Sequence, residues 1–260
     1  MREVRAPLLE VKNLSKRFGG VVAVSDFSFA LGESELVGII GPNGAGKTTV
    51  LNLVSGLYRA DSGQILFAGS DITSLQPWRI ARLGVSRTFQ NIRLFEGLTV
   101  LENVKVPRGW HSRYGFLRAL GRDPWVGREE REIQAQAQKA LDLVGLAGYS
   151  DALASSLPYG LQRRVELARA LASSPRLLLL DEPAAGLNPQ EVRELIELIG
   201  VIRRELGLAI ILIEHRMEVI MELCDWIYVL DFGRLIAQGT PSQVREDPVV
   251  IKAYLGEEFE

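Results

Sequence analysis

The chain has little cysteine, no long apolar run and no excess charge of either sign. Its single cysteine, Cys224, excludes an intramolecular disulfide framework and a multi-cysteine zinc site. The most apolar stretch, residues 206–213, falls short of the roughly 18 residues that a spanning helix needs. With 30 basic and 32 acidic residues, the net charge is −2, which argues against a protein that coats DNA or RNA. The first residues resemble no signal peptide, so the expected compartment is the cytosol.

The composition is that of an ordinary globular protein. Hydrophobic residues make up 47% and charged residues 24% of the 260 positions, which excludes wholesale disorder. A chain of this length buries a core without help from disulfides or metals. We therefore expect a folded protein of one domain.

Strand and helix patterns alternate on both sides of a helical middle. Strands are predicted at 8–14, 21–29, 35–40, 64–69, 177–180, 208–213 and 226–230, with a hairpin strand at 233–237. Helices are predicted at 47–55, 128–143, 161–173 and 188–202, and the basic stretch 108–122 is predicted to be a loop or insertion. This order indicates a single α/β domain over 1–260, with a core of about 1–90 and 160–240, a helical lobe of about 91–159 and short C-terminal helices in about 241–260.

A glycine-rich loop follows the predicted strand at 35–40. Residues 41–48 read Gly-Pro-Asn-Gly-Ala-Gly-Lys-Thr and match the pattern GxxxxGK[ST] in full. Gly44 and Gly46 let the backbone bend around an anion, and the next helix adds its positive N-terminal end. Lys47 would reach the β- and γ-phosphates, and the Thr48 hydroxyl would ligate Mg²⁺. A chance match in a turn is the alternative, but the flanking strand and helix favour a phosphate-binding loop.

Two acidic residues end the leucine-rich strand at 177–180. A carboxylate at the carboxyl end of a buried strand stands where α/β sheets bind ligands. Asp181 is expected to help hold Mg²⁺, and Glu182 to polarise an attacking water. The alternative is that these acids are an ordinary solvated strand end. The presence of the phosphate loop in the same chain favours the Mg²⁺ and water-activating roles over that alternative.

Four further segments resemble those of the ATP-binding cassette (ABC) ATPases. Residues 157–164 resemble the signature motif, Gln90 the Q-loop glutamine, residues 185–188 the D-loop and His215 the switch histidine. The resemblance covers about residues 8–255. It implies a P-loop NTPase (RecA-like) α/β core with a mainly parallel sheet, an N-terminal antiparallel β subdomain and an inserted helical subdomain.

One subfamily resembles the chain further. Residues 89–104, the tail at 239–257 and the insertion between 106 and 132 are similar to the ATPase of branched-chain amino acid importers. The lipopolysaccharide-export ATPase has a similar C-terminal tail but resembles the middle of this chain less well. The resemblance therefore implies an ATPase that powers import of branched-chain amino acids, with an exporter ATPase as the alternative.

The family's roles carry over to matching positions. Phe18 would stack on the adenine, unless it is only a hydrophobic residue at a strand end. His215 would contact the γ-phosphate and position water with Glu182, unless it caps a helix. Gln90 would touch Mg²⁺, together with Thr48 and Asp181, and report nucleotide state to the membrane partner. The phosphates would be held by Asn43, Gly44, Ala45, Gly46, Lys47, Thr48 and Thr49.

The signature segment departs from the family pattern. Pro158 stands where a serine usually donates its hydroxyl to the nucleotide of the opposite subunit, and proline has neither that hydroxyl nor an N–H. Tyr159 replaces a glycine and Leu161 a glutamine, whereas Gly160 remains. The hypothesis is that ATP still closes the dimer, with one fewer hydrogen bond across it.

The resemblance also implies the partners. ATP and Mg²⁺ would bind between two cassettes, the second being the same chain or a paralogue. Separate transmembrane permease subunits would dock at a groove beside Gln90 that is built partly from residues 91–104, and a periplasmic or extracellular binding protein would act through them. The chain would then sit peripherally on the cytoplasmic face of the membrane. A soluble ABC machine acting on nucleic acid or the ribosome is the weaker alternative, because the chain has one cassette, no heptad array and one cysteine.

Overall fold

The computed structural model describes residues 6–109 and 124–255, so most of the basic stretch at 108–122 lies outside the described residues. The described chain divides into two compact units. The core unit holds the residues up to Arg87 and those from Arg176 onward. The helical unit is Thr88–Pro175.

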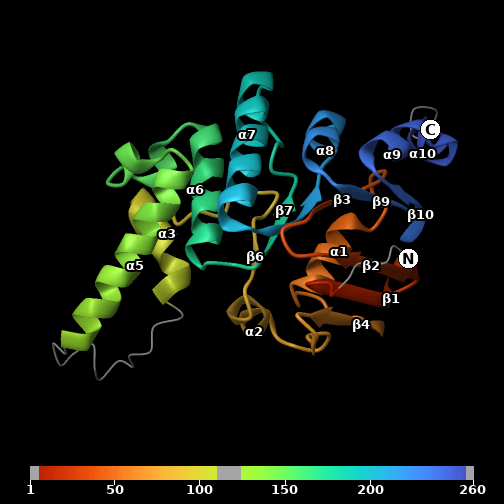
Figure 1. The fold of residues 1–260 in the computed structure, drawn as a ribbon, viewed down its shortest axis with the longest axis horizontal. Coiled ribbons are helices and arrows are strands. Elements are labelled where there is room, and N and C mark those ends of the chain that lie inside the picture. The colour runs from red at the N-terminus through yellow and green to blue at the C-terminus, as the bar shows by residue number, and fades with distance from the viewer. Residues whose placement is uncertain (1–5, 110–123, 256–260) are drawn as a thin grey trace. The chain divides into compact units, whose positions relative to one another are not determined.

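An antiparallel sheet opens the core unit (Figure 1). Its strands are β1 (Leu9–Phe18), β2 (Val21–Leu31), β4 (Ser62–Phe67) and β5 (Ser70–Asp71), in the order β2-β1-β4-β5. Along β1 and β2 apolar side chains alternate into the core, as expected for a sheet with one covered face. Strand β1 runs to Phe18, beyond the predicted 8–14, because its polar second half still pairs with β2.

A second sheet of six strands has the order β10-β9-β3-β8-β7-β6. Every neighbouring pair is parallel except the hairpin of β9 and β10. The apolar runs of β3, β7 and β8 are buried throughout, which is typical of strands covered on both faces. The bounds are β3 (Leu36–Ile40), β6 (Val85–Arg87), β7 (Leu177–Asp181), β8 (Ala209–Ile213), β9 (Trp226–Asp231) and β10 (Arg234–Gly239).

Helix α7 (Pro189–Leu206) shows why the core helices form where they do. Asn188 caps its start, and the side chain of Glu191 accepts a hydrogen bond from the N–H of Asn188 in return. Its apolar face is buried as the sequence predicts, at Val192, Leu195, Ile196, Ile199 and Ile202. The other core helices are α1 (Lys47–Val54), α2 (Pro77–Arg82), α8 (Met217–Leu223), α9 (Pro241–Glu246) and α10 (Pro248–Leu255).

Three helices pack together in the helical unit (Figure 1). They are α3 (Val100–Gly109), α5 (Pro124–Leu143) and α6 (Tyr159–Ala172), and the short turns η1 (Ala147–Tyr149) and η2 (Ala154–Ser156) lie between α5 and α6. Because α6 packs on both α3 and α5, it belongs to this unit. The lobe predicted at 91–159 ended before this helix.

Several short elements carry no sequence signal that predicts them. Helix α2 buries only Ile80, β6 has three residues, and α8 follows the strand end at Ile213 without a capping side chain. Such elements form because the surrounding chain holds them. Across the two described ranges, no helix combines the length and apolarity that crossing a bilayer would require.

Candidate nucleotide-binding and hydrolysis site

The glycine-rich loop joins the carboxyl end of β3 to the start of α1, and two glycines shape it. Gly41 has a φ of 147°, and a Cβ there would lie 1.9 Å from the carbonyl oxygen of Leu230. Gly46 precedes α1 with a φ of 98°, and a Cβ there would lie 2.2 Å from the carbonyl oxygen of Ala23. Both positions therefore require glycine, since a larger residue would collide with main chain.

Lys47 folds back over this loop. Its Nζ donates hydrogen bonds of 2.7 Å each to the carbonyl oxygens of Gly41 and Pro42, and the residue is only 5% exposed. Asn43 and Thr48 stay exposed on either side. A buried ammonium at the N-terminal end of a helix creates a positive concavity that suits a phosphate group.

The predicted acid pair lies at the carboxyl end of β7. Asp181 is 2% exposed, and its Oδ2 pairs with Arg87 at 2.8 Å. Burial raises the pKa of Asp181, and the charges of Arg87 and Lys47 oppose that rise. Its buried Oδ1 accepts no hydrogen bond. An oxygen of this kind fits a hard cation such as Mg²⁺.

Glu182 and His215 meet beside it. The Nε2 of His215 lies 3.0 Å from Oε1 of Glu182. Strands β7 and β8 bring them together, since Asp181 pairs with Ile213 in the parallel register. The N–H of Glu182 also donates to the carbonyl oxygen of Ile213 at 2.9 Å. A carboxylate held by an imidazole is an arrangement that can take a proton from water.

Glu214 is a residue that the sequence reasoning missed. Its buried carboxylate accepts from the N–H groups of Ala184 at 2.6 Å, His215 at 3.0 Å and Arg216 at 3.2 Å. Burial raises its pKa in spite of these bonds. Glu214 directly follows a buried strand, at the same sheet edge as Asp181. This position is the sequence signal that could have identified it as a site residue.

Arg216, on the other side of His215, was missed too. Its guanidinium donates to the carbonyl oxygen of Leu187 at 2.8 Å. The two neighbours of His215, Glu214 and Arg216, therefore hold the segment 184–187 at both of its ends. This clamp fixes the D-loop-like segment relative to the histidine. Arg87, which pairs with Asp181, had no sequence signal, because it stands in a strand of three residues.

Phe18 ends β1 as an exposed aromatic side chain. It is 42% exposed and stacks edge-on against Tyr58, with ring centroids 5.1 Å apart. The Nζ of Lys16 lies 5.4 Å from the centroid of the Phe18 ring. An exposed aromatic ring next to a cation offers a surface for a flat base. Tyr58 was not predicted to take part.

Gln90 and the signature segment belong to the helical unit. Helix α6 begins at Tyr159, with Pro158 before it and no side chain capping its first turn. Gly160 and Leu161 lie half-buried in that turn. The carbonyl oxygen of Gln90 accepts a hydrogen bond from Arg163 of the same helix. The predicted Q-loop and signature segments are therefore in contact within this unit.

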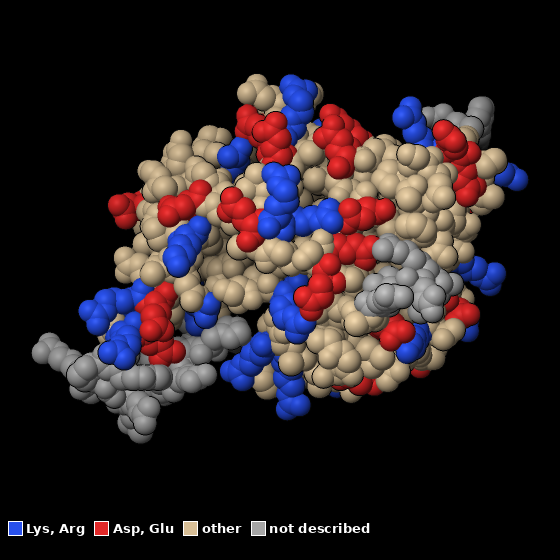
Figure 2. Space-filling model, viewed as in Figure 1, with Lys and Arg blue, Asp and Glu red and all other residues tan. Residues whose placement is uncertain are grey.

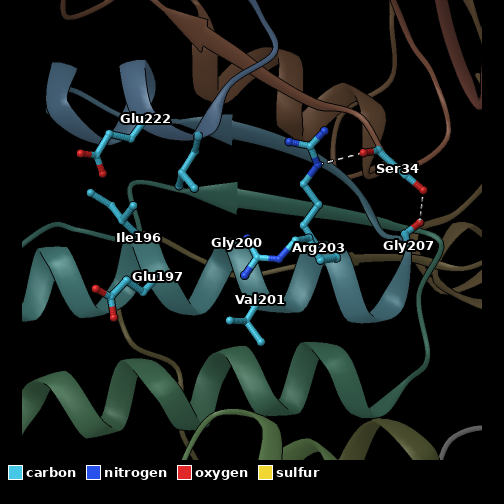
Figure 3. A pocket seen from close by; sticks show the side chains of 10 residues that line it. Ser34, Ile196, Glu197, Gly200, Val201, Arg203, Gly207 and Glu222 are labelled. Carbon is cyan, nitrogen blue, oxygen red and sulfur yellow. Dashed lines mark hydrogen bonds between the residues drawn. The ribbon is translucent and has the colours of Figure 1, made fainter.

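A hollow of about 860 Å³ lies elsewhere in the core unit (Figure 3). Around it Arg203 donates to the carbonyl oxygen of Ser34 at 2.9 Å, and the Ser34 hydroxyl donates to that of Gly207 at 2.8 Å. Ser34 precedes β3 and Gly207 precedes β8, so the hollow lies at the amino ends of the strands. The phosphate loop and the acid pair lie at their carboxyl ends, the edge where α/β sheets bind ligands.

Two family models match the chain. Residues 24–185 match the model described as ABC transporter. Residues 234–260 match the model described as branched-chain amino acid ATP-binding cassette transporter. The first match contains the phosphate loop, the Q-loop and signature segments and the acid pair.

Relatives and solved structures agree with these matches. The chain is 46% identical to the high-affinity branched-chain amino acid transport ATP-binding protein BraF of Pseudomonas aeruginosa, over 96% of this chain and 98% of that protein. It is 45% identical to LivG of Escherichia coli over the same shares. A nucleotide-free ATP-binding cassette from an ABC transporter superposes with a TM-score of 0.82 at 31% identity, covering 95% of this chain and 98% of that one. The ADP conformation of MJ1267, an ATP-binding cassette of an ABC transporter, gives a TM-score of 0.84 at 31% identity, covering 96% of this chain and 99% of that one. The chain therefore belongs to the ABC transporter family, as an ATP-hydrolysing cassette subunit.

Proposed function

We propose that this chain powers the import of branched-chain amino acids by hydrolysing ATP. The observation that carries the proposal is its 45–46% identity to BraF and LivG over nearly the whole length of each protein. The separate match of residues 234–260 to a branched-chain amino acid cassette model supports the same substrate class.

The phosphate loop binds the triphosphate in this proposal. Lys47 leaves the carbonyl oxygens of Gly41 and Pro42 and pairs with the β- and γ-phosphates, while the amides of residues 43–49 surround them. The buried position of the ammonium supports this role, because a phosphate there meets a charge that water screens little. Phe18 provides the surface for the adenine.

Thr48, Asp181 and Gln90 are the proposed Mg²⁺ ligands. The unbonded Oδ1 of Asp181 supports this assignment, since a buried carboxylate oxygen without a donor is suited to a cation. Mg²⁺ at this place neutralises charge that develops on the phosphates.

Glu182 is the proposed general base and His215 its partner. Glu182 takes a proton from the attacking water as the water oxygen bonds to the γ-phosphorus. The bond from that phosphorus to the β–γ bridging oxygen breaks, which leaves ADP and phosphate. The 3.0 Å contact with His215 holds the carboxylate in place, and Glu214 and Arg216 hold the backbone around that histidine.

The proposed assembly contains more chains than this one. A second cassette, identical or paralogous, completes each nucleotide site with its segment Pro158, Tyr159, Gly160 and Leu161. Transmembrane permease subunits carry the substrate, and a periplasmic or extracellular binding protein delivers it. The chain then lies on the cytoplasmic face of the membrane as a peripheral subunit.

An action on nucleic acid is less well supported. On the face drawn in Figure 2, basic and acidic side chains are interspersed and do not gather by sign. A protein that follows a phosphate backbone needs a basic stripe. An exporter ATPase, the second candidate within the family, is less well supported, because residues 234–260 match the branched-chain amino acid cassette model.

The test is to purify the chain from native membranes with its partners and to rebuild the complex in proteoliposomes. We expect hydrophobic membrane subunits to co-purify, and ATP to drive uptake of leucine, isoleucine or valine supplied with the binding protein. Lysine and glutamate serve as control substrates. Co-purification with RNA or DNA, or ATP-driven movement of a lipid-linked substrate only, would contradict the proposal.

A further inference from the structure

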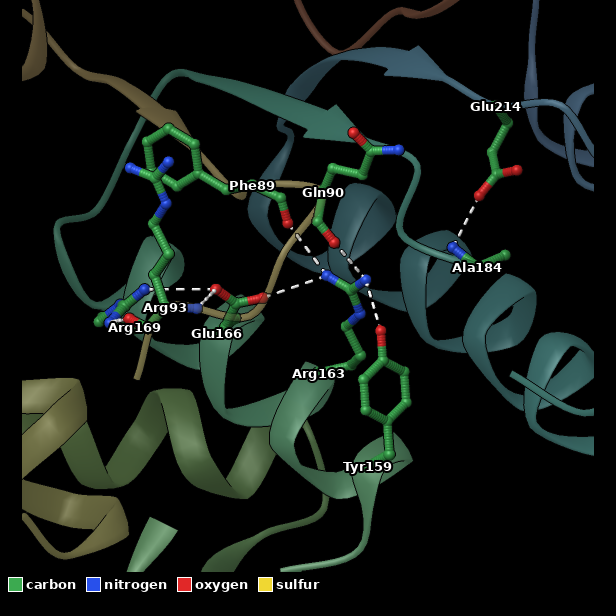
Figure 4. A network of polar contacts seen from close by, with 9 residues as sticks. All are labelled: Phe89, Gln90, Arg93, Tyr159, Arg163, Glu166, Arg169, Ala184 and Glu214. Carbon is green, nitrogen blue, oxygen red and sulfur yellow. Dashed lines mark hydrogen bonds and ion pairs between the residues drawn. The ribbon is translucent and has the colours of Figure 1, made fainter. Parts of the chain in front are cut away.

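Helix α6 carries three charged side chains in a single network, of which Arg163 and Glu166 are buried and Arg169 is half-buried (Figure 4). Arg163 is 7% exposed and Glu166 is 2% exposed, and Arg169 lies one turn further on. Burying charges is costly unless each one is paired and hydrogen-bonded. The partners of these three residues therefore indicate what the network holds in place.

Arg163 holds the main chain around Gln90. Its guanidinium donates to the carbonyl oxygen of Phe89 at 3.0 Å and also to that of Gln90. In Figure 4 the side-chain amide of Gln90 points away from Arg163. The contact thus fixes the backbone of this residue while its amide is directed elsewhere.

Glu166 and Arg169 hold the next part of the same segment. Glu166 accepts from the N–H of Arg93 at 2.8 Å, and Arg169 donates to the carbonyl oxygen of Arg93. The guanidinium of Arg93 lies 4.4 Å from the centroid of the Phe89 ring, which closes the segment on itself. Both ends of residues 89–93 are therefore bound to one helix.

Tyr159 explains part of the unusual signature segment. Its hydroxyl lies 2.8 Å from Arg163, whose guanidinium also lies 5.2 Å from the centroid of the ring. A glycine at this position would offer neither contact. The residue that departs from the family pattern thus orients the arginine that holds the Q-loop segment.

We propose that Arg163 and Glu166 are positioning residues that bind segment 89–93 to helix α6, so that Gln90 moves with the signature helix. The proposal rests on the roles given to Gln90 and the signature segment above. It adds the link between them: nucleotide bound at the signature helix of one cassette shifts the Q-loop of the same cassette through these side chains. Neither residue touches the nucleotide in this scheme.

The test is hydrogen exchange, followed by mass spectrometry, on the full-length chain. In Arg163→Met, amides in residues 89–95 are expected to exchange at least about tenfold faster, because that segment loses its anchor. Peptides from the phosphate loop and from α5 are expected to keep their rates, and ATP affinity is expected to stay within about twofold. Arg163→Lys is expected to restore part of the protection, since one ammonium cannot reach both carbonyl oxygens as a guanidinium does.

Arg131→Met is the matched control, because it removes an exposed arginine from α5 of the same unit. Glu166→Gln keeps the shape of the side chain but removes its charge. If Arg163→Met does not fold well enough to be purified, the same exchange measurement is made on Glu166→Gln. Exchange in 89–95 no faster than in the control, or acceleration spread equally over α3, α5 and α6, would overturn the proposal. The exchange measurement uses no transported substrate, so a negative result would not contradict the proposed import function. A failure of import in proteoliposomes would likewise not contradict the link between α6 and segment 89–93.

Discussion

At the scale of single residues, Glu182 has an unusual backbone. Its φ of 49° lies in the left-handed region, which costs a residue other than glycine of order 1–3 kcal/mol. The hydrogen bond from its N–H to Ile213 and the contact of its side chain with His215 hold it there. Such strain is typical of residues whose side chain must point in one direction.

Replacing Glu182 by glutamine tests its role directly. The amide keeps the shape of the carboxylate but cannot accept the proton of the attacking water. We expect ATP turnover to fall by at least ~100-fold, the size of a general-base contribution. ATP binding should change by less than about twofold. Phosphate release and fluorescent-nucleotide titration measure the two effects. The exposed Glu197→Gln is the control, and normal turnover in Glu182→Gln would remove this residue from the mechanism.

Cys224 provides a second prediction at this scale. The thiol is buried, and burial raises its pKa well above the usual range. The pKa of this thiol is higher in the folded state than the value of about 9 in the unfolded state. Its contribution to the free energy of unfolding is therefore present below about pH 9 and is lost as the pH rises above that value.

The native thiol should therefore react with iodoacetamide at pH 8 at least ~100-fold more slowly than the unfolded thiol. Because the chain has no other cysteine, mass spectrometry of the labelled protein reports unfolding directly. Rapid labelling without denaturant would show that the region around Cys224 opens locally.

At the scale of elements, helices α6 and α7 begin in different ways. Asn188 caps α7 by accepting from the N–H groups of Gln190 at 2.9 Å and Glu191 at 3.0 Å. Pro158 precedes α6 and offers no side-chain acceptor to its first turn. The two helices therefore differ in whether the side chain before the first turn accepts a hydrogen bond from its N–H groups.

Pro158→Ser tests two separate effects of having proline before α6, one on the stability of the chain and one on ATP-driven dimerisation. As a cap, the serine should raise the free energy of unfolding by about 1 kcal/mol in urea titrations. As a donor to the nucleotide of the opposite subunit, it should tighten ATP-driven dimerisation by roughly 1.5–3 kcal/mol. Dimerisation is measured by ultracentrifugation in a Glu182→Gln background, where ATP persists.

Pro158→Ala is the control, because it removes the ring without adding a hydroxyl. An unchanged dimer affinity in Pro158→Ser, relative to Pro158→Ala, would count against a hydrogen bond missing from the wild-type dimer.

At the scale of the whole molecule, the proposed ligand should stabilise the folded chain. A ligand that binds only the folded state at 100 times its Kd adds about 2.7 kcal/mol. We expect Mg-ATP to raise the Tm of the wild-type chain accordingly, and Lys47→Ala to lose most of this rise. Scanning calorimetry measures both, and Lys139→Ala, on an exposed face of α5, is the control. An equal rise in Lys47→Ala would place the triphosphate outside the loop.

Much of the core site could be predicted because its signals are local. The phosphate loop lies within eight consecutive residues between a buried strand and a helix, and the acid pair directly follows four leucines. In each case neighbouring residues in the sequence are also neighbours in space, so a pattern of residue types is enough. The resemblance of these motifs to one family, confirmed by the matches over most of the chain, supplied the class of activity.

Other contacts depended on the tertiary structure. Arg87 meets Asp181 across 94 positions, Glu214 reaches Ala184 across 30, and Arg163 binds the carbonyl oxygen of Phe89 across 74. Arginine and glutamate are common on any helix or strand end, so nothing in the local pattern marks these ones. By itself the sequence determined the loop, the acid pair and the family. The order of the strands decided that Arg87 pairs with Asp181 and that Glu214 reaches Ala184. The packing of α6 decided that Arg163 binds the segment at Phe89, because a charge enters a protein interior only where the fold supplies its partner.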